Sequence, residues 1–240
     1  MCIILDMSNM LKKRRLHPSI FEIIFSIPKS FFFNLKVFPF KTAIKMPIFI
    51  SCYTKTKGIN RKNFICSLQN PKFGLCRIGI SGSETGLLIK KTSLLYIHNG
   101  GKIIINGPVS ISRGAYIEAN NGIITFGSDV KMNTGCYIEA ELSNIEIGDN
   151  CSFGWNCVIK NCDGHHIYVD DKETKNNGDI HIGNHCWICS EASIFKNGYL
   201  PDDSVLAYKS FLSKKISDKP NCLYAGFPAK IIKENIEWKA

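Results

Sequence analysis

Large aliphatic residues recur at every sixth position in the second half of the chain. The clearest series contains Ile182, Ile188, Ile194, Leu200, Leu206 and Leu212, and the same spacing occurs earlier at Ile147, Phe153 and Ile159. A small residue lies four positions after most of them, as at Cys186, Ala192, Gly198, Ser204 and Ser210. A period of six is neither the 3.6 of a helix nor the alternation of an ordinary strand. It indicates a repeat architecture.

This period predicts a chain that is wound as a triangular coil. Each hexapeptide would form one flat face, and three faces would complete a turn of about eighteen residues. One aliphatic side chain per face would point inward and stack on its counterpart in the next turn. The second inward position must be small because the cross-section narrows near the corners. Cysteines occupy it at Cys136, Cys151, Cys157 and Cys186, and we interpret them as reduced core residues.

The pattern divides the 240 residues into three regions. Residues 1–95 are expected to form an N-terminal basic and aromatic cap with an irregular β region. Six-residue faces then run over 96–216, with slips near 120–125 and 140–145 and a polar excursion loop at 161–179. Residues 217–240 form a C-terminal tail, in which Glu234 to Trp238 are predicted to be a short helix. The fold class is therefore all-β, a parallel β-helix.

The register of the repeat between 97 and 145 stays ambiguous. One phase contains Ile97, Ile103 and Val109, and an overlapping phase contains Ile105, Ile111, Ile117 and Ile123. The pattern alone does not choose between them.

The first fifty residues combine phenylalanines with lysines. Short helices are expected at Pro18 to Ser26 and Lys29 to Lys36. One interpretation is a cap that covers the open end of the coil, which a solenoid needs. The alternative is a basic, aromatic surface that rests on an anionic membrane.

Charge and motif content narrow the function classes. The net charge of +10 favours acidic partners, but the basic residues are dispersed and no nucleic-acid-binding module is present. Met1 to Leu16 has the wrong order of charged and apolar segments for a signal peptide, and no apolar run approaches the roughly 20 residues of a membrane span. We expect a cytoplasmic protein, and the membrane alternative would place it at the inner face of the membrane. His181 and His185 do not share a helical face, so no metal site is expected.

Four features together resemble the left-handed β-helix acyltransferases. They are the hexapeptide faces, the segment Ile182 to Ile188, the loop Asp163-Gly164-His165, and the ending Ala225 to Lys230. Within that superfamily the chain is most similar to the O-acetyltransferases of bacterial capsule and surface-polysaccharide pathways. The resemblance implies a left-handed coil, acetyl-CoA as acyl donor, a sugar or oligosaccharide acceptor, and a homotrimer. The chain departs from the family pattern at Cys189-Ser190-Glu191 and at Tyr208-Lys209.

Acyl transfer to a sugar hydroxyl needs a base that removes the hydroxyl proton. His165 matches the family's loop histidine and is the expected base, with His166 as the alternative. Asp163 could accept a hydrogen bond from the other ring nitrogen and fix the tautomer, as could a backbone carbonyl.

The resemblance also implies contacts with the acyl donor. Trp187 would line the acyl end of the cofactor channel, or alternatively fill a subunit contact. Ser190 and Ala207 would make backbone contacts with the pantetheine, and Lys214 and Lys230 would lie toward the nucleotide unless they are simply solvated lysines.

The expected function is therefore an acetyl-CoA-dependent O-acetyltransferase that acts on a sugar of a surface polysaccharide or its precursor, by direct transfer in a ternary complex. Two alternatives stay open: N-acetylation of an amino-sugar nucleotide, and a binding solenoid that has lost catalysis.

Overall fold

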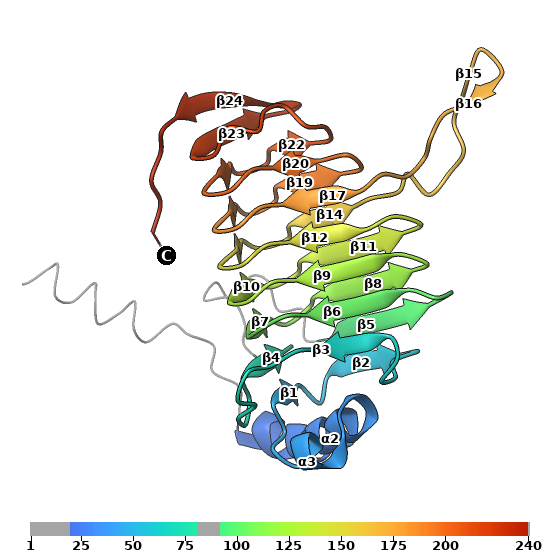
Figure 1. Cartoon of the computed structure of the whole chain (residues 1–240), viewed down its shortest axis with the longest axis vertical. Coiled ribbons are helices and arrows are strands. Elements are labelled where there is room, and N and C mark those ends of the chain that lie inside the picture. The colour runs from blue at the N-terminus through green and yellow to red at the C-terminus, as the bar shows by residue number, and fades with distance from the viewer. Residues whose placement is uncertain (1–19, 81–91, 240) are drawn as a thin grey trace, which may run out of the picture.

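The computed structural model describes residues 20–80 and 92–239, and these form a parallel β-helix with two helices at one end (Figure 1). The helices are α2 (Ile20–Val37) and α3 (Phe40–Ala43). The expectations for Met1 to Leu16 and for a helix start at Pro18 lie outside the described residues. No helix in the described ranges is both long and apolar enough to span a bilayer.

Each coil contributes strands to three sheets. Sheet A contains, in spatial order, β1 (Ile48–Ile50), β4 (Cys76–Ile78), β7 (Val109–Ile111), β10 (Val130–Met132), β13 (Ser152–Phe153), β18 (Trp187–Ile188), β21 (Val205–Leu206), β23 (Cys222–Gly226) and β24 (Ala229–Glu234). Sheet B contains β2 (Thr54–Lys57), β5 (Ser93–His98), β8 (Tyr116–Asn120), β11 (Tyr137–Glu141), β14 (Val158–Lys160), β19 (Ser193–Phe195) and β22 (Phe211–Leu212). Sheet C contains β3 (Phe64–Cys66), β6 (Lys102–Ile105), β9 (Ile123–Phe126), β12 (Ile145–Ile147), β17 (Ile180–Ile182) and β20 (Tyr199–Leu200).

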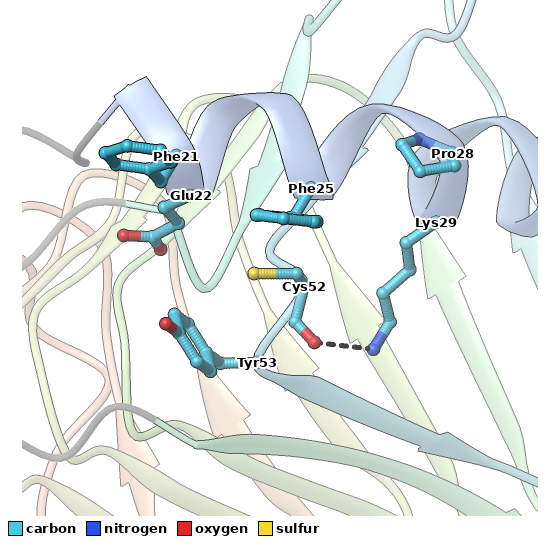
Figure 2. Close-up of a pocket in the computed structure, with 7 residues that line it drawn as sticks. All are labelled: Phe21, Glu22, Phe25, Pro28, Lys29, Cys52 and Tyr53. Atoms are coloured by element: carbon cyan, nitrogen blue, oxygen red, sulfur yellow. Dashed lines mark hydrogen bonds between the residues drawn. The ribbon is translucent and has the colours of Figure 1, made fainter.

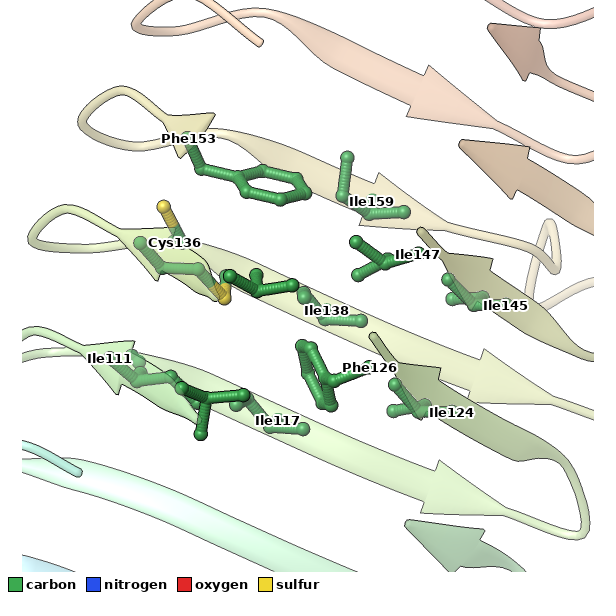
Figure 3. Close-up of a cluster of buried hydrophobic side chains, with 14 of the residues drawn as sticks. Ile111, Ile117, Ile124, Phe126, Cys136, Ile138, Ile145, Ile147, Phe153 and Ile159 are labelled. Atoms are coloured by element: carbon green, nitrogen blue, oxygen red, sulfur yellow. The ribbon is translucent and has the colours of Figure 1, made fainter. Parts of the chain in front are cut away.

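The core is the predicted column of stacked side chains (Figure 3). Cys136, Cys151, Cys157 and Cys186 are all buried within it, as expected of the small inward position. Both candidate phases of the repeat contribute to the core, because a strand such as β6 directs two side chains inward, Ile103 and Ile105. The expected inward position of Ile123 is wrong, since Ile124 and Phe126 are the buried residues of β9.

The coils are not all eighteen residues long. Ile117 pairs with Ile138 and Ile138 with Ile159, a repeat of 21 residues, whereas Ile194 pairs with Leu212 at a repeat of 18. The extra residues lie at the corner between sheets B and C, where Leu142 has a positive φ. The slips in the sequence pattern are therefore longer corners, and the excursion loop leaves from this same corner.

Two expected boundaries are corrected. The coil begins at β1, because β1 and β4 already pair in parallel, so the cap itself comprises residues 20–47. A single helix, α2, replaces the two expected helices and contains Pro28. Pro28 is tolerated because it lies on the exposed side of the helix, where the carbonyl of Ile24 that it leaves unbonded is near solvent.

The expected C-terminal helix is wrong. Strand β24, which pairs antiparallel with β23 and extends sheet A, ends at Glu234, and residues 235–239 form no helix or strand. The tail after β24 is held in an extended form against the coil, because the Ile236 amide donates to the Asn221 carbonyl and Trp238 Nε1 donates to the His185 carbonyl, each at 2.9 Å.

Candidate functional site

The excursion loop is held at its base and exposed at its tip. It leaves the coil through a narrow neck, in which Cys162 pairs with Asn177 and the Asp163 amide donates to the Asn176 carbonyl at 2.7 Å. The buried Asn161 accepts a hydrogen bond from the Glu141 amide at 2.7 Å, which ties the neck to the preceding coil. Beyond the neck, the hairpin of β15 (Tyr168–Val169) and β16 (Lys172–Glu173) projects away from the coil (Figure 1).

Asp163 does not form the expected hydrogen bond with His165. Its carboxylate is ion-paired with Lys196, which lies at the corner of the next coil and also donates to the Lys175 carbonyl at 2.9 Å. Asp163 therefore fastens the loop to the coil. His165 is exposed and makes no hydrogen bond to any residue in the described ranges.

The neighbouring histidine is the one that has a carboxylate partner. The Nδ1 atom of His166 contacts the carboxylate of Glu173 across the hairpin, and both side chains are largely exposed. His166 is thus held by the hairpin, whereas the ring of His165 is available to a substrate.

Trp187 emerges on the outer face of sheet A, where it is 41% exposed. The C-terminal tail folds back beside Trp187 and places the ring of Trp238 at 5.9 Å from the Trp187 ring. Trp238 also stacks on His185 at 4.2 Å and donates from Nε1 to the His185 carbonyl at 2.9 Å. Trp238 is therefore a neighbour of the expected acyl site that the sequence pattern did not reveal.

Ser190 and Ala207 lie in adjacent coils at the corner between sheets A and B. The Ser190 hydroxyl accepts from the Trp155 amide at 3.0 Å. The Ala207 amide donates to the Tyr224 carbonyl at 2.8 Å and its carbonyl accepts from the Ser210 amide at 3.2 Å, so both backbone groups already have partners within the coil. Lys230 is exposed on β24 above this corner, opposite Ala225. These three expected donor contacts are therefore brought together.

Lys214 is not brought to that corner. It follows β22 and is exposed at the corner between sheets B and C, on the side of the excursion loop.

The two departures from the family pattern contact each other. The register that pairs Ile188 with Leu206 places Glu191 beside Lys209, and Lys209 Nζ lies 3.5 Å from the Glu191 carboxylate. Lys209 also lies 5.3 Å from the ring centroid of Tyr208. The altered corner residues therefore contact one another, in the same corners as Ser190 and Ala207, the expected donor contacts.

Within one chain, His165 and Trp187 are carried by different corners of the coil. The loop leaves at the corner between sheets B and C, whereas Trp187 follows the corner between sheets C and A. Sheet C separates the two corners, so a single chain does not place the expected base beside the expected donor channel.

The outer face of sheet B carries an aromatic and acidic surface that the sequence analysis missed. Tyr116 and Tyr137 stack at 4.6 Å, and each hydroxyl donates to a carboxylate, of Glu118 and Glu139 respectively. Glu139 is in turn paired with Lys160 at 2.9 Å. Burial, followed by these hydrogen bonds, raises the pKa of both tyrosines. The signal was present as the tetrapeptide Tyr-Ile-Glu-Ala, which occurs twice at a spacing of 21.

The histidines and cysteines do not gather into a metal-binding set. Over residues 20–80 and 92–239, no three ligating side chains come together. His181 is instead 3.4 Å from Glu146 and stacked on Tyr199. Cys186 is buried, Cys189 is partly exposed, and both are free thiols.

Comparison with known proteins supports the fold. The chain is 30% identical over 195 residues to an uncharacterized 24.8 kDa protein in the cps region of Klebsiella pneumoniae, with 81% of this chain and 86% of that protein covered. The structure of the polySia-specific acetyltransferase NeuO matches with a TM-score of 0.51 and 21% identity, covering 80% of this chain and 82% of that one. A mutant of AntD, an N-acyltransferase from Bacillus cereus solved with dTDP and coenzyme A, has a TM-score of 0.46 and 17% identity, with 75% of this chain and 83% of that one covered. No family model matches. The match to NeuO confirms the predicted left-handed β-helix.

Proposed function

The chain belongs to the family of the 24.8 kDa protein in the cps region of Klebsiella pneumoniae, and from this premise we propose that it is an acetyltransferase of surface-polysaccharide assembly. It would transfer an acetyl group from acetyl-CoA to a sugar hydroxyl of the polysaccharide or its precursor. The observation that carries this proposal is His165, an exposed histidine on a loop that is fastened to the corner of a left-handed coil. The buried, reduced cysteines favour a cytoplasmic location.

His165 is proposed as the general base. Its ring nitrogen would take the proton of the acceptor hydroxyl while that oxygen attacks the thioester carbonyl. The thioester bond breaks as the ester forms, and the proton passes to the departing thiolate, so no acyl-enzyme is needed. Asp163 is a positioning residue in this scheme, because its ion pair with Lys196 fixes the base of the loop.

The complete site is proposed to lie between two copies of the chain in a homotrimer. The loop of one copy would reach the face of the next copy that carries Trp187, Ser190, Ala207 and Lys230. This arrangement is supported by the separation of His165 from Trp187 within one chain and by the exposure of both side chains. Lys214, on the side of the loop, and Lys230 would contact the phosphates of the donor from opposite sides of the groove.

The test is incubation of the protein with acetyl-CoA and a panel of oligosaccharides and nucleotide sugars. Thiol release measures the rate, and mass and NMR spectra identify the acetylated atom. We expect an O-acetylated sugar, with kcat/KM lowered about 100-fold or more in His165→Ala. His166→Ala is the matched control and should retain most of the activity.

Three results would contradict parts of this proposal. Full activity in His165→Ala would remove the assigned base, and an N-acetylated product would change the acceptor class. Absence of any rise in melting temperature with millimolar acetyl-CoA would favour a binding solenoid without catalysis, because a ligand that binds only the folded state must stabilise it.

A further inference from the structure

Helix α2 is inverted over most of its length relative to an ordinary amphipathic helix, because four of the six side chains that it buries are polar. The other two, Phe33 and Val37, lie near its C-terminal end and pack into the apolar core. Glu22, Ser26, Ser30 and Asn34 recur every fourth residue along one face, and each is at most 4% exposed. A surface helix normally turns its polar face to solvent and its apolar face to the core.

The polar face is buried because it completes the edge of sheet A. Strand β1 is the first strand of that sheet, so its outer backbone groups have no strand partner. The Asn34 amide donates to the Ile48 carbonyl at 2.7 Å, and its oxygen accepts from the Ile48 amide at 3.2 Å. The Ser30 hydroxyl exchanges hydrogen bonds with the Ile50 amide and carbonyl in the same way. The side chains of the helix thus replace a missing strand.

The consequence is an apolar face that points away from the protein. Seven large side chains of α2 on this face are exposed, from 38% to 75%: Ile20, Phe21, Ile23, Ile24, Phe25, Ile27 and Phe32. Phe40 in α3 and Ile44, which follows it, are also exposed, at 68% and 51%. A hollow of about 570 Å³ lies beside Phe21, Phe25 and Tyr53 (Figure 2). Soluble monomeric proteins rarely leave an apolar surface of this kind uncovered.

The exposed charged side chains of the cap, residues 20–47, are all basic. Within residues 20–47, Lys36, Lys41 and Lys45 are exposed, and Lys29 is half-buried and donates to the Cys52 carbonyl at 3.2 Å. The single acidic residue in this range is Glu22, which is buried in an ion pair with Arg113. A surface that is apolar at its centre and basic at its margin complements an anionic bilayer, where lysines meet headgroups and aromatic side chains enter the acyl boundary.

We propose that the cap formed by α2 and α3 is a peripheral membrane anchor that lies in the surface of a bilayer containing anionic lipids. A protein partner fits less well, because protein interfaces carry about one hydrogen bond per 100–200 Å² and the outer residues of α2 from Ile23 to Ile27 are all without side-chain donors or acceptors. The helix would lie in the plane of the membrane, in keeping with its inability to span one.

This orientation leaves the excursion loop in solution. The loop begins after β14, whose coil contributes the fifth strand of sheet A counted from β1. Four strand spacings place it roughly 20 Å along the coil axis from β1. The anchor and the proposed active site are therefore at separate levels of the molecule and can be tested independently.

The test is sedimentation of the full chain with vesicles of phosphatidylcholine alone and with added phosphatidylglycerol. We expect binding to the anionic vesicles at low salt and weaker binding at high salt. The double variant Phe21→Ser, Phe25→Ser should bind at least about tenfold more weakly. The triple variant Lys36→Gln, Lys41→Gln, Lys45→Gln should lose the preference for anionic vesicles. Ile232→Ser, an equally exposed apolar position at the other end of the coil, is the matched control and should bind like the wild type.

Melting temperatures equal to that of the wild type would show that the cap variants remain folded, since every altered side chain points outward. Failure of the wild type to bind anionic vesicles at low salt would overturn the proposal. If the phenylalanine variant instead lowers the oligomeric state in sedimentation velocity without vesicle binding, the face belongs to a contact between copies. Vesicle binding needs no acetyl transfer, so this result and the failure of the proposed function are distinguishable.

Discussion

The inward cysteines fill the small position of the coil, and the Sγ atoms of three of them also contact a backbone carbonyl. The Sγ atoms of Cys136, Cys151 and Cys186 lie 3.1–3.2 Å from backbone carbonyls at the corners of the following coils. Alanine would fit the same space, but a thiol also offers a weak donor to a carbonyl that is shielded from water. A small inward position can therefore be predicted from the spacing, whereas its bond to a particular carbonyl depends on the stacking of coils.

The tyrosines of sheet B make stability sensitive to high pH. Because the pKa values of Tyr116 and Tyr137 are raised in the folded protein, the unfolded chain loses its phenolic protons first as the pH passes about 10. Their contribution is complete below that pH and is lost as the pH rises toward the folded values. We expect the melting temperature to fall above pH 10, and to fall less steeply in the double variant Tyr116→Phe, Tyr137→Phe.

Thermal unfolding at pH 8, 10 and 11 measures this difference. Tyr168→Phe, at the exposed hairpin, is the control and should follow the wild type. A residual slope is expected from Tyr224, since burial raises its pKa to about 12. An alkaline slope that is unchanged in the double variant would disprove the role of the stacked pair.

At the scale of elements, the corner between sheets B and C explains most irregularities in the repeat. The inward Ile147 lies nine positions after Ile138 across this corner, whereas Leu200 lies six positions after Ile194. Corners lie outside the core, so extra residues there cost little packing, and the excursion loop is the extreme case. The loop was therefore predictable from its polarity. The structure of its neck could not be predicted, because the ion pair between Asp163 and Lys196 joins residues 33 apart in sequence.

The loop should be removable without loss of the coil. We expect replacement of residues 164–175 by Asn-Gly, a favoured two-residue hairpin turn, to preserve the Cys162–Asn177 pairing and the Asp163–Lys196 ion pair. The melting temperature should stay within a few degrees of the wild type, while acetyl transfer falls to background because His165 is gone. Circular dichroism and the thiol-release assay measure the two effects.

A variant that loses the loop and still transfers acetyl groups would place the base elsewhere on the coil. Unfolding of the variant would instead show that the loop is needed for stability.

Helix α2 illustrates an element whose existence was predicted but whose orientation was not. A stripe of Glu22, Ser26, Ser30 and Asn34 is typical of a solvated face when only the helix is considered. The edge strand β1 reverses this, because its backbone groups form hydrogen bonds with those side chains. Nothing in the helix sequence reveals which strand lies beside it.

At the scale of the whole molecule, the coil assembles the proposed donor contacts and separates them from the proposed base. If the site lies between copies, His165→Ala and Trp187→Ala should complement each other. Co-expression of the two chains would give about one quarter of the interfaces an intact loop facing an intact tryptophan, if the copies mix at random. We expect acetyl transfer in the whole mixture to recover to about that fraction of the wild-type rate, with each variant alone near background.

Size-exclusion chromatography with light scattering checks the trimer, and the thiol-release assay checks the recovery. A mixture no more active than the two single variants would argue that one chain supplies both residues. Trp238→Phe, which keeps an aromatic ring beside Trp187, is a useful companion and should reduce activity less than Trp187→Ala.

The sequence by itself determined the coil, its inward residues and the polar loop, because a hexapeptide repeat is a local pattern that each face must satisfy on its own. It also predicted His165 as the base, since the motif Asp163-Gly164-His165 is local too. The tertiary structure alone decided the partner of Asp163, the contact of Glu191 with Lys209, the irregular tail in place of the expected C-terminal helix, and the inverted helix α2. Each of these depends on which coil or edge lies next to a residue, and that neighbour is set by corner lengths that the period of six does not encode.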